Sequence, residues 1–284
     1  MGRLILNADD FGLTSGVNRA VAELHRAGAL TSATLMARAA ATDEAIEIAR
    51  STPSLGVGCH VVLVDGVPVL SPTRDIPFLA DPVDGCFHPT LFGFLNELSH
   101  FDPKLIRDIE AETAAQIALL QSKCISLTHI DTHKHVHMFP AVLRPVLRAA
   151  RAAGIRAVRN PFEPAWSRRA TLHAPWLRRA QVSLLRLWEP AFRRIVAEEG
   201  FTTTDGALGV LATGTLDAAT LAALLRNLPA GTWELVTHPG YNNADLARAH
   251  TRLLASRETE RAALAPFHWR DGIELINFSR MGNS

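Results

Sequence analysis

The sequence predicts an α/β fold, an irregular (β/α) TIM-like barrel with mostly parallel strands, in a single domain over residues 1–284. Short apolar runs alternate with helix-like segments almost from end to end, and such alternation implies parallel strands joined by right-handed crossovers. Roughly eight such units in one chain favour a barrel over two domains. An open doubly wound sheet is the alternative. No glycine-rich fingerprint follows the first apolar run, so no dinucleotide site is expected.

The individual elements follow from local signals. The apolar run 3–7 reads as a buried strand, and the helix after it ends before Gly28, a typical residue to follow a helix end. Thr42 is a candidate N-cap, and Pro103 suits the first turn of a long helix. The expected strands are 3–7, 29–36, 55–63, 127–131, 155–159, 201–211, 234–237 and 274–278, and the expected helices are 15–27, 42–50, 103–121, 141–153, 217–228 and 257–264.

Two long segments interrupt this alternation. Residues 65–101 are rich in Pro, Gly and Phe, and residues 160–200 are also irregular. Both are too long for ordinary connections, which favours functional loops that carry small elements of their own. The prediction is therefore one barrel domain with insertions near 65–101 and 160–200.

The composition excludes several classes of protein. The chain has 29 Lys+Arg against 28 Asp+Glu, a formal net charge of +1, which argues against a nucleic-acid partner. Its three cysteines lack C-x-x-C spacing, so neither a disulfide framework nor a zinc ribbon is expected. The opening residues do not resemble a signal peptide, and no apolar window is long enough to span a membrane. We therefore expect a cytoplasmic protein.

Ionisable side chains follow the ends of the predicted strands. Asp9 and Asp10 follow the first strand, His60 ends the third, and Arg159 and His238 follow later ones. Reactive groups in parallel barrels lie at the carboxyl ends of the strands, so these side chains are expected to meet. Adjacent carboxylates can serve as a metal ligand and a general base, although Asp-Asp before Phe-Gly is also typical of a turn. The other three have ordinary structural alternatives: a core or rim histidine, a surface ion pair and a Pro-Gly loop.

The most informative stretch is a run of histidines. His129, Asp131, His133, His135 and His137 alternate with other residues, and period-two spacing places them on one face of an extended segment. Two imidazoles and a carboxylate with open positions describe a catalytic site for zinc or a similar divalent metal. The spacing does not say which histidine is the ligand. The alternative is a solvated histidine-rich edge.

Taken together, these motifs resemble the YdjC-like carbohydrate deacetylases, and the resemblance runs from the first strand to position 240. Within that family the chitooligosaccharide deacetylases and the hopanoid-biosynthesis deacetylases are the most similar branches. The resemblance implies an irregular barrel that removes acetyl groups from N-acetylated sugars with one divalent metal ion, Mg²⁺ or Zn²⁺, and it implies a homodimer. The motifs are NADDFG at 7–12, Gly58-x-His60, THIDTHKHVHM at 128–138, Arg159-x-Pro161 and His238-Pro239-Gly240.

The family's roles transfer position by position. The resemblance implies that Asp10, His60 and His133 hold the metal. It implies that Asp9 is the catalytic base, His238 the acid and Arg159 the arginine beside the base, while Cys59 faces the core. Asp131, His135 and His137 are expected to lie behind the ligands or to contact the substrate.

One segment bears on the substrate. Residues 167–194 contain seven arginines and a single acid, Glu189, with tryptophans and leucines interleaved, a pattern typical of segments at anionic membrane surfaces. This favours a lipid-linked sugar such as an acetylglucosaminyl hopanoid, and contact with the inner face of the membrane. In the alternative, the apolar face packs on the barrel and the arginines are solvated, and the substrate is a soluble chitooligosaccharide such as diacetylchitobiose. Phosphoester hydrolysis and non-catalytic metal or sugar binding are more distant alternatives; Asp9 and His238 argue against the latter.

Overall fold

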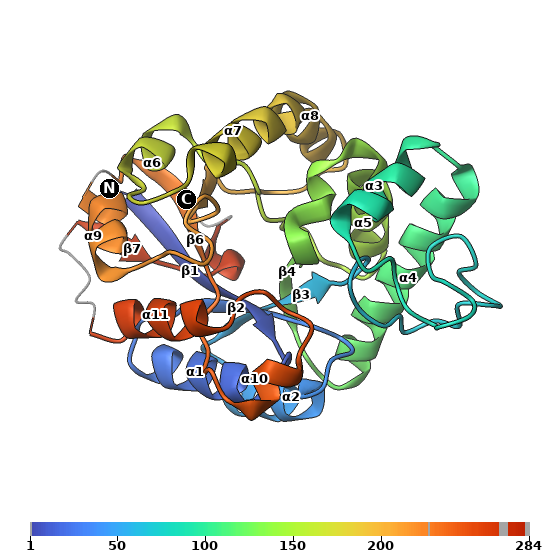
Figure 1. Cartoon of the computed structure of the whole chain (residues 1–284), viewed down its shortest axis with the longest axis horizontal. Coiled ribbons are helices and arrows are strands. Elements are labelled where there is room, and N and C mark those ends of the chain that lie inside the picture. Colours follow the sequence, from blue (N-terminus) through green and yellow to red (C-terminus); the bar gives the residue numbers. More distant parts are fainter. Residues whose placement is uncertain (1, 227, 267–271, 282–284) are drawn as a thin grey trace.

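The computed structural model describes residues 2–226, 228–266 and 272–281. A single sheet lies at its centre, with the order β4-β3-β2-β1-β6-β5 and with β7 also paired to β1 (Figure 1). All of its strand pairs are parallel, which confirms the predicted α/β class. The strands are β1 (Gly2–Phe11), β2 (Ser32–Leu35), β3 (Gly56–Val61), β4 (Leu127–Thr132), β5 (Gly206–Leu208), β6 (Gly231–Thr237) and β7 (Ile273–Leu275).

The central strand is β1, and it uses both of its edges. Along one edge β6 pairs with it from Gly2 to Ala8. The other edge is shared, because β7 pairs with Gly2–Leu4 and β2 pairs with the part from Asn7 to Phe11. This explains why β1 is buried almost throughout. A bulge between Ala8 and Phe11 interrupts its pairing with β2.

Several predicted strands are wrong in extent: the strand expected over 3–7 is Gly2–Phe11, and the one expected over 29–36 is Ser32–Leu35. The two largest differences lie where the barrel closes. Only isolated bridges, Ile130 to Val158 and Ala157 to Thr202, form where strands were expected over 155–159 and at the start of 201–211. The Thr203 hydroxyl donates to the Val158 carbonyl at 2.7 Å, so a side chain supplies a bond that a backbone amide would make in a regular ladder. The sheet is therefore curled and only loosely closed.

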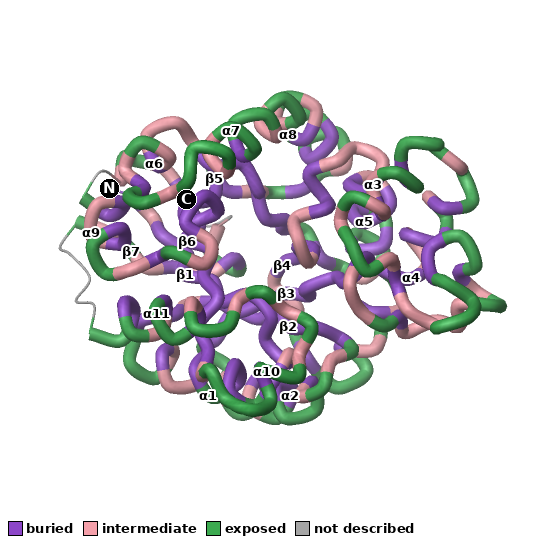
Figure 2. The backbone as a smooth tube through the Cα atoms, in the orientation of Figure 1, coloured by how far each residue is buried: buried purple, intermediate pink, exposed green. Residues whose placement is uncertain are grey.

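The helices surround this sheet, and Figure 2 shows buried backbone at the centre with exposed helices outside. The six helices predicted from the alternation are confirmed to within about two residues at each end. Thr42 is the first residue of its helix rather than the N-cap, and its hydroxyl donates to the Met36 carbonyl instead. The six are α1 (Ser15–Arg26), α2 (Thr42–Ser51), α4 (Pro103–Ser122), α5 (Pro140–Ala152), α9 (Ala218–Arg226) and α11 (Ala255–Leu264).

Short helices lie within the two irregular segments, 65–101 and 160–200, and also outside them. No helix within the described ranges is long and apolar enough to cross a membrane. These short elements are α3 (Leu91–Ser99), η1 (His133–Met138), α6 (Ala165–Ala170), α7 (Trp176–Leu185), η2 (Arg186–Trp188), α8 (Glu189–Glu198), α10 (Ala244–Arg248) and η3 (Phe278–Arg280).

Candidate active site

The end of β1 turns two adjacent carboxylates toward one place. Asp9 and Asp10 lie in the bulged part of the strand, and Asp10 has a left-handed backbone with φ of 61°. Successive side chains of a regular strand point to opposite faces, so the bulge and the positive φ are what allow both carboxylates to reach this end of the sheet. Both are buried, with exposed fractions of 2% and 4%. A non-glycine residue in this conformation is strained, a feature that clusters at functional sites.

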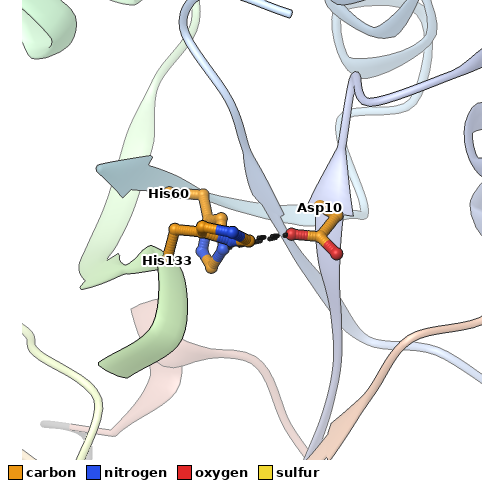
Figure 3. A group of neighbouring side chains, drawn as sticks. All are labelled: Asp10, His60 and His133. Atoms are coloured by element: carbon orange, nitrogen blue, oxygen red, sulfur yellow. Dashed lines mark ion pairs between the residues drawn. The ribbon is translucent and has the colours of Figure 1, made fainter. Parts of the chain in front are cut away.

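Asp10, His60 and His133 form a histidine cluster, which Figure 3 shows. His60 comes from β3 and His133 from the start of η1, and both rings point toward Asp10. The Asp10 Oδ1 atom lies 3.4 Å from His60 Nε2 and 3.2 Å from His133 Nδ1. One ligand atom from each residue lies within 4.8 Å of the others, a spacing that fits coordination of a single metal ion.

The partner of His60 supports this interpretation. Its Nδ1–H donates to Asp131 Oδ1 at 2.7 Å, which leaves Nε2 directed at the cluster, as in carboxylate–histidine–metal arrangements. Burial lowers the pKa of His60, but Asp131 and Asp10 outweigh it and raise this pKa to about 10. The negative field that stabilises a proton here also attracts a cation. The donor set therefore fits a divalent ion.

The histidine run does not continue along one face, and that prediction is wrong. The strand ends at Thr132, and Lys134 and His135 have left-handed φ values of 56° and 55°, which turn the chain into η1. Alternation therefore stops at the strand end. Of the histidines in the run, only His133 belongs to a group whose spacing could hold a metal ion, within the described residues.

The other histidines of the run have structural surroundings. His129 stacks on Phe278 with ring centroids 3.7 Å apart and lies over Gly58, where an added Cβ would come within 2.4 Å of its ring. His137 contacts the Thr132 hydroxyl at 2.7 Å and, through Nε2, the Arg159 carbonyl at 3.2 Å. Burial lowers the pKa of His137 to about 4, so this ring is neutral at ordinary pH. His135 is half-buried, with its ring 6.3 Å from that of His137.

A second group, the arginine cluster, consists of Asp9, Asp131, Arg159 and Glu234. The Arg159 guanidinium donates to Asp9 Oδ1 at 2.6 Å and to Asp9 Oδ2 at 2.8 Å. It also donates from Nε to Glu234 Oε1 at 2.7 Å and contacts Asp131 Oδ2. One fully buried arginine thus holds three buried carboxylates. Asp131 links the two clusters, because its other oxygen accepts the bond from His60.

Arg159 changes the pKa of Asp9 and the pKa of Glu234 to different extents. Burial raises the pKa of Asp9, but the charge of Arg159 outweighs it and holds this pKa far below its usual value. For Glu234 the balance is reversed: burial is the larger effect, and the pKa rises to about 7. Asp9 is therefore ionised at neutral pH, while Glu234 holds a proton part of the time.

His238 lies beside Asp9. Its Nε2 is 3.7 Å from Asp9 Oδ2, and its Nδ1 is 3.9 Å from Glu260 Oε2. The backbone N–H of His238 donates to the same Glu260 oxygen at 2.5 Å, which fixes the residue at the end of β6. Two carboxylates thus flank one imidazole. A ring placed in this way can exchange a proton with a bound molecule.

Sequence reasoning missed three buried charged residues of the site: Glu234, Arg257 and Glu260. Arg257 donates to Asp10 Oδ2 at 2.5 Å, and its charge outweighs the burial of Asp10 and lowers the pKa of that carboxyl. Arg257 and Glu260 are three residues apart on α11, so one helix face reaches both Asp10 and His238. Charged residues on the buried stripe of an amphipathic helix were the available signal.

The comparisons with known proteins agree with this geometry. A family description, "YdjC-like protein", matches residues 3–273. The chain belongs to the YdjC-like family. This confirms the family expected from the motifs.

Three curated relatives of this YdjC-like protein are named "Carbohydrate deacetylase". The Brevibacillus brevis protein is 41% identical over 148 residues, which cover 52% of this chain and 55% of that protein. The chain thus spans little more than half the length of that relative. The Mus musculus protein is 32% identical and covers 84% of this chain and 78% of its own. The protein of Thermoanaerobacter pseudethanolicus is 27% identical over 98% of this chain and 99% of its own.

A solved structure matches the whole fold. It is a protein of Enterococcus faecalis V583 whose name assigns it provisionally to cellobiose-phosphate cleavage. The TM-score is 0.76 at 24% identity, over 98% of this chain and 97% of that one. At this identity the match shows that the fold of this YdjC-like protein is shared, and nothing about its substrate.

Proposed function

We propose that this YdjC-like protein is a metal-dependent hydrolase that removes the acetyl group from an N-acetylglucosamine-type sugar. The observation that carries the proposal is the pair of clusters at the end of β1: a three-residue metal-binding group beside an ionised carboxylate and an imidazole. The names of the curated relatives support the same reaction class.

In this proposal Asp10, His60 and His133 hold the ion, because a carboxylate and two imidazoles suit zinc and also accommodate magnesium. When bound, a divalent ion there supplies Lewis-acid chemistry, polarising the acetamide carbonyl and lowering the pKa of water. Arg257 holds the second oxygen of Asp10, so only Oδ1 faces the histidines.

Asp9 and His238 move the protons in this reaction. Asp9 Oδ2, held by Arg159 and facing His238, accepts the proton of the attacking water. His238 Nε2 donates a proton to the departing nitrogen, which an amide requires because an amine anion is a very poor leaving group. Arg159 and Glu260 are positioning residues for these two groups.

The charge of the site favours an uncharged acetamide over a phosphoester. Arg159 and Arg257 are each bound to aspartates of the site. Lys134, next to His133, pairs with Asp65 at 2.5 Å. With these cations neutralised by carboxylates, little positive charge is left to bind a phosphate.

Within this reaction class we favour a lipid-linked N-acetylglucosamine, with a soluble chitooligosaccharide as the second candidate. The exposed apolar side chains of α7 support the first. The homodimer implied by the resemblance stays a prediction.

The test is acetate release from N,N′-diacetylchitobiose and from an N-acetylglucosaminyl lipid, after chelation and after adding back zinc or magnesium. We expect no release after chelation and recovery with metal. Full activity after chelation and dialysis would rule out metal dependence. No release from either substrate, with metal demonstrably bound, would rule out the substrate class.

A further inference from the structure

The apolar side chains of α7 and η2 face solvent. Their exposed fractions are 79% for Trp176, 55% for Leu177, 66% for Leu184, 74% for Leu187 and 43% for Trp188. The spacing of these residues places them within one sector of a continuous helical path. We call these five residues the exposed stripe. Tryptophan and leucine side chains gathered in this way are unusual on a protein surface that meets only water.

The opposite side of α7 is the one that meets the protein. Val182 is buried there, and the Arg179 guanidinium donates to the backbone carbonyls of Arg168, Thr171 and Ala174. The alternative stated for the segment 167–194, with its apolar face on the barrel and its arginines in water, therefore does not describe α7, although it does describe α8, where Phe192 is buried and Arg193 and Arg194 are exposed. On α7 the arrangement is reversed. Of the exposed stripe, Trp188 contacts Phe139, and the other four side chains are each more than half exposed.

A cationic groove lies beside the stripe. It has a volume of about 510 Å³ and is lined by three arginines, Arg168, Arg186 and Arg193, together with Leu187 from the stripe. Glu189 is the acidic residue of its lining and pairs with both Arg186 and Arg193, so the groove keeps a positive balance. The segment 167–194 contains seven arginines and one acid in a chain of net charge +1, so the rest of the chain is net negative.

This surface lies at the end of the barrel that holds the site. The Arg178 side chain donates to the Val210 carbonyl, just after the carboxyl end of β5, at 3.1 Å. On the other side, the Trp188 ring lies 5.9 Å from Phe139, which directly follows η1 and its ligand His133. In Figure 1, α7 and α8 run along the upper edge of the molecule.

We propose that the exposed stripe and the adjacent arginine groove dock this protein on an anionic phospholipid bilayer. Tryptophan and leucine side chains enter the interface between headgroups and acyl chains, while arginines contact lipid phosphates. Charge selects this occupant: the groove is lined by three arginines and one acid, and this positive balance favours a negatively charged surface and disfavours a second copy presenting the same groove. Docking would bring the carboxyl-end rim toward the membrane, where a lipid-linked sugar is presented.

The test is co-sedimentation with vesicles of phosphatidylcholine alone or mixed with phosphatidylglycerol, at low and high salt. We expect binding to the anionic vesicles at low salt and weakening at high salt. In Trp176→Ser/Leu187→Ser the partition coefficient should fall at least roughly tenfold, because two large apolar side chains no longer enter the interface. Arg186→Gln/Arg193→Gln should lose about fivefold for each arginine removed.

The matched control is Phe92→Ser on α3, because Phe92 is also strongly exposed, at 83%, but lies outside the stripe. It should bind like the parent chain. Equal binding to neutral and anionic vesicles, or no binding by the parent chain, would overturn the proposal. So would a parent dimer that Trp176→Ser/Leu187→Ser converts to monomers without any vesicle binding. Vesicle binding is measured without substrate, so a failure to bind vesicles does not contradict the proposed deacetylase activity. Likewise, a failure to release acetate does not contradict the proposed membrane docking.

Discussion

Asp9 and Asp10 are neighbours in the chain, yet their carboxylates belong to clusters with different surroundings. In the arginine cluster a guanidinium holds Asp9, Asp131 and Glu234, and no side chain is more than 3% exposed. In the histidine cluster Asp10 faces two imidazoles, and the His133 side chain is 21% exposed. The first cluster is the more deeply buried, and within it Asp9 Oδ2 is turned toward His238. The second is open on one side, so an ion can enter. The two adjacent aspartates therefore have different neighbours, a guanidinium with two further carboxylates in one cluster and two imidazoles in the other, although the pKa of each is held below its usual value.

Replacing Asp9, the proposed catalytic base, should have the largest effect on activity. We expect Asp9→Asn to lower kcat by about 10²- to 10⁴-fold, the usual contribution of a positioned general base. Asp9 lies outside the group formed by Asp10, His60 and His133, but it belongs to a second group whose spacing could hold a metal, Asp9, His60 and Asp131. Unchanged metal affinity is therefore the result expected when the first group holds the ion. Acetate release and metal content measure the two quantities, with the exposed Asp43→Asn as control. Loss of metal together with activity would mean that the two clusters do not act separately.

Replacing Arg159 tests how strongly its ion pairs in the arginine cluster stabilise the folded protein. We expect Arg159→Met to lower the free energy of unfolding by about 3–5 kcal/mol, because it leaves buried carboxylates without their partner. Arg50→Met is the control: Arg50 pairs with Glu47 at 3.0 Å, but both side chains are more than half exposed, so the loss of stability should stay below about 1 kcal/mol. Urea unfolding measures the free energy of unfolding of both variants. Equal losses in the two variants would show that burial of the arginine cluster does not increase the stability that its ion pairs provide.

The open side of the histidine cluster can be tested with His133. We expect His133→Ala to weaken metal binding by about 100-fold or more, since one of three ligands is lost. His137→Ala should leave metal affinity unchanged, because His137 contacts Thr132 and the Arg159 backbone instead. Chelator competition distinguishes the two. Equal weakening in both variants would return His137 to the set of candidate ligands.

The smallest expected effect concerns the third carboxylate around Arg159. The pKa of Glu234 rises from 4.5 to about 7 on folding. The folded state therefore holds this proton more tightly, and its contribution to stability is present below pH 4.5 and is lost as the pH rises toward 7. Glu234→Gln cannot titrate, so its stability relative to the parent chain should increase over that window by at most about 1.4 kcal/mol per pH unit. Urea midpoints across this range measure it, and a constant difference would show that Glu234 is ionised throughout.

The sequence predicted the regular parts of the fold because local pattern and tertiary structure agree there. The helix expected over 103–121 is Pro103–Ser122, and the strand expected over 127–131 is Leu127–Thr132. The predicted strands failed where side chains make hydrogen bonds that the backbone would make in a regular strand. At Thr203 a hydroxyl bonds to a carbonyl that a regular strand would have paired with an amide. The hydrophobic periodicity of the sequence does not show where a side-chain hydroxyl takes the place of a backbone amide.

The site divides in the same way. The meeting of strand ends at one edge of a parallel sheet pointed to Asp10, His60 and the histidine run, and the family resemblance singled out His133 within that run. The structure brings the three together. Arg257 was missed: its place on the buried stripe of α11 was a signal that it is buried, but not that it reaches Asp10, 247 positions away along the chain. The left-handed turn at Lys134 and His135 was also invisible, since neither residue type demands a positive φ. A contact made by tertiary folding leaves no periodic trace in the sequence.

The shared edge of β1 has a consequence for how the chain is made. Within the sheet this strand is synthesised before the others, whereas β6 and β7, which pair with most of its length, are synthesised after the other strands. Until β6 and β7 emerge from the ribosome, the apolar run Leu4–Leu6 is not paired with these two strands. Pairing across such a sequence separation is slow and leaves an aggregation-prone strand exposed. We therefore expect the growing chain to depend on chaperones until its final strands are released.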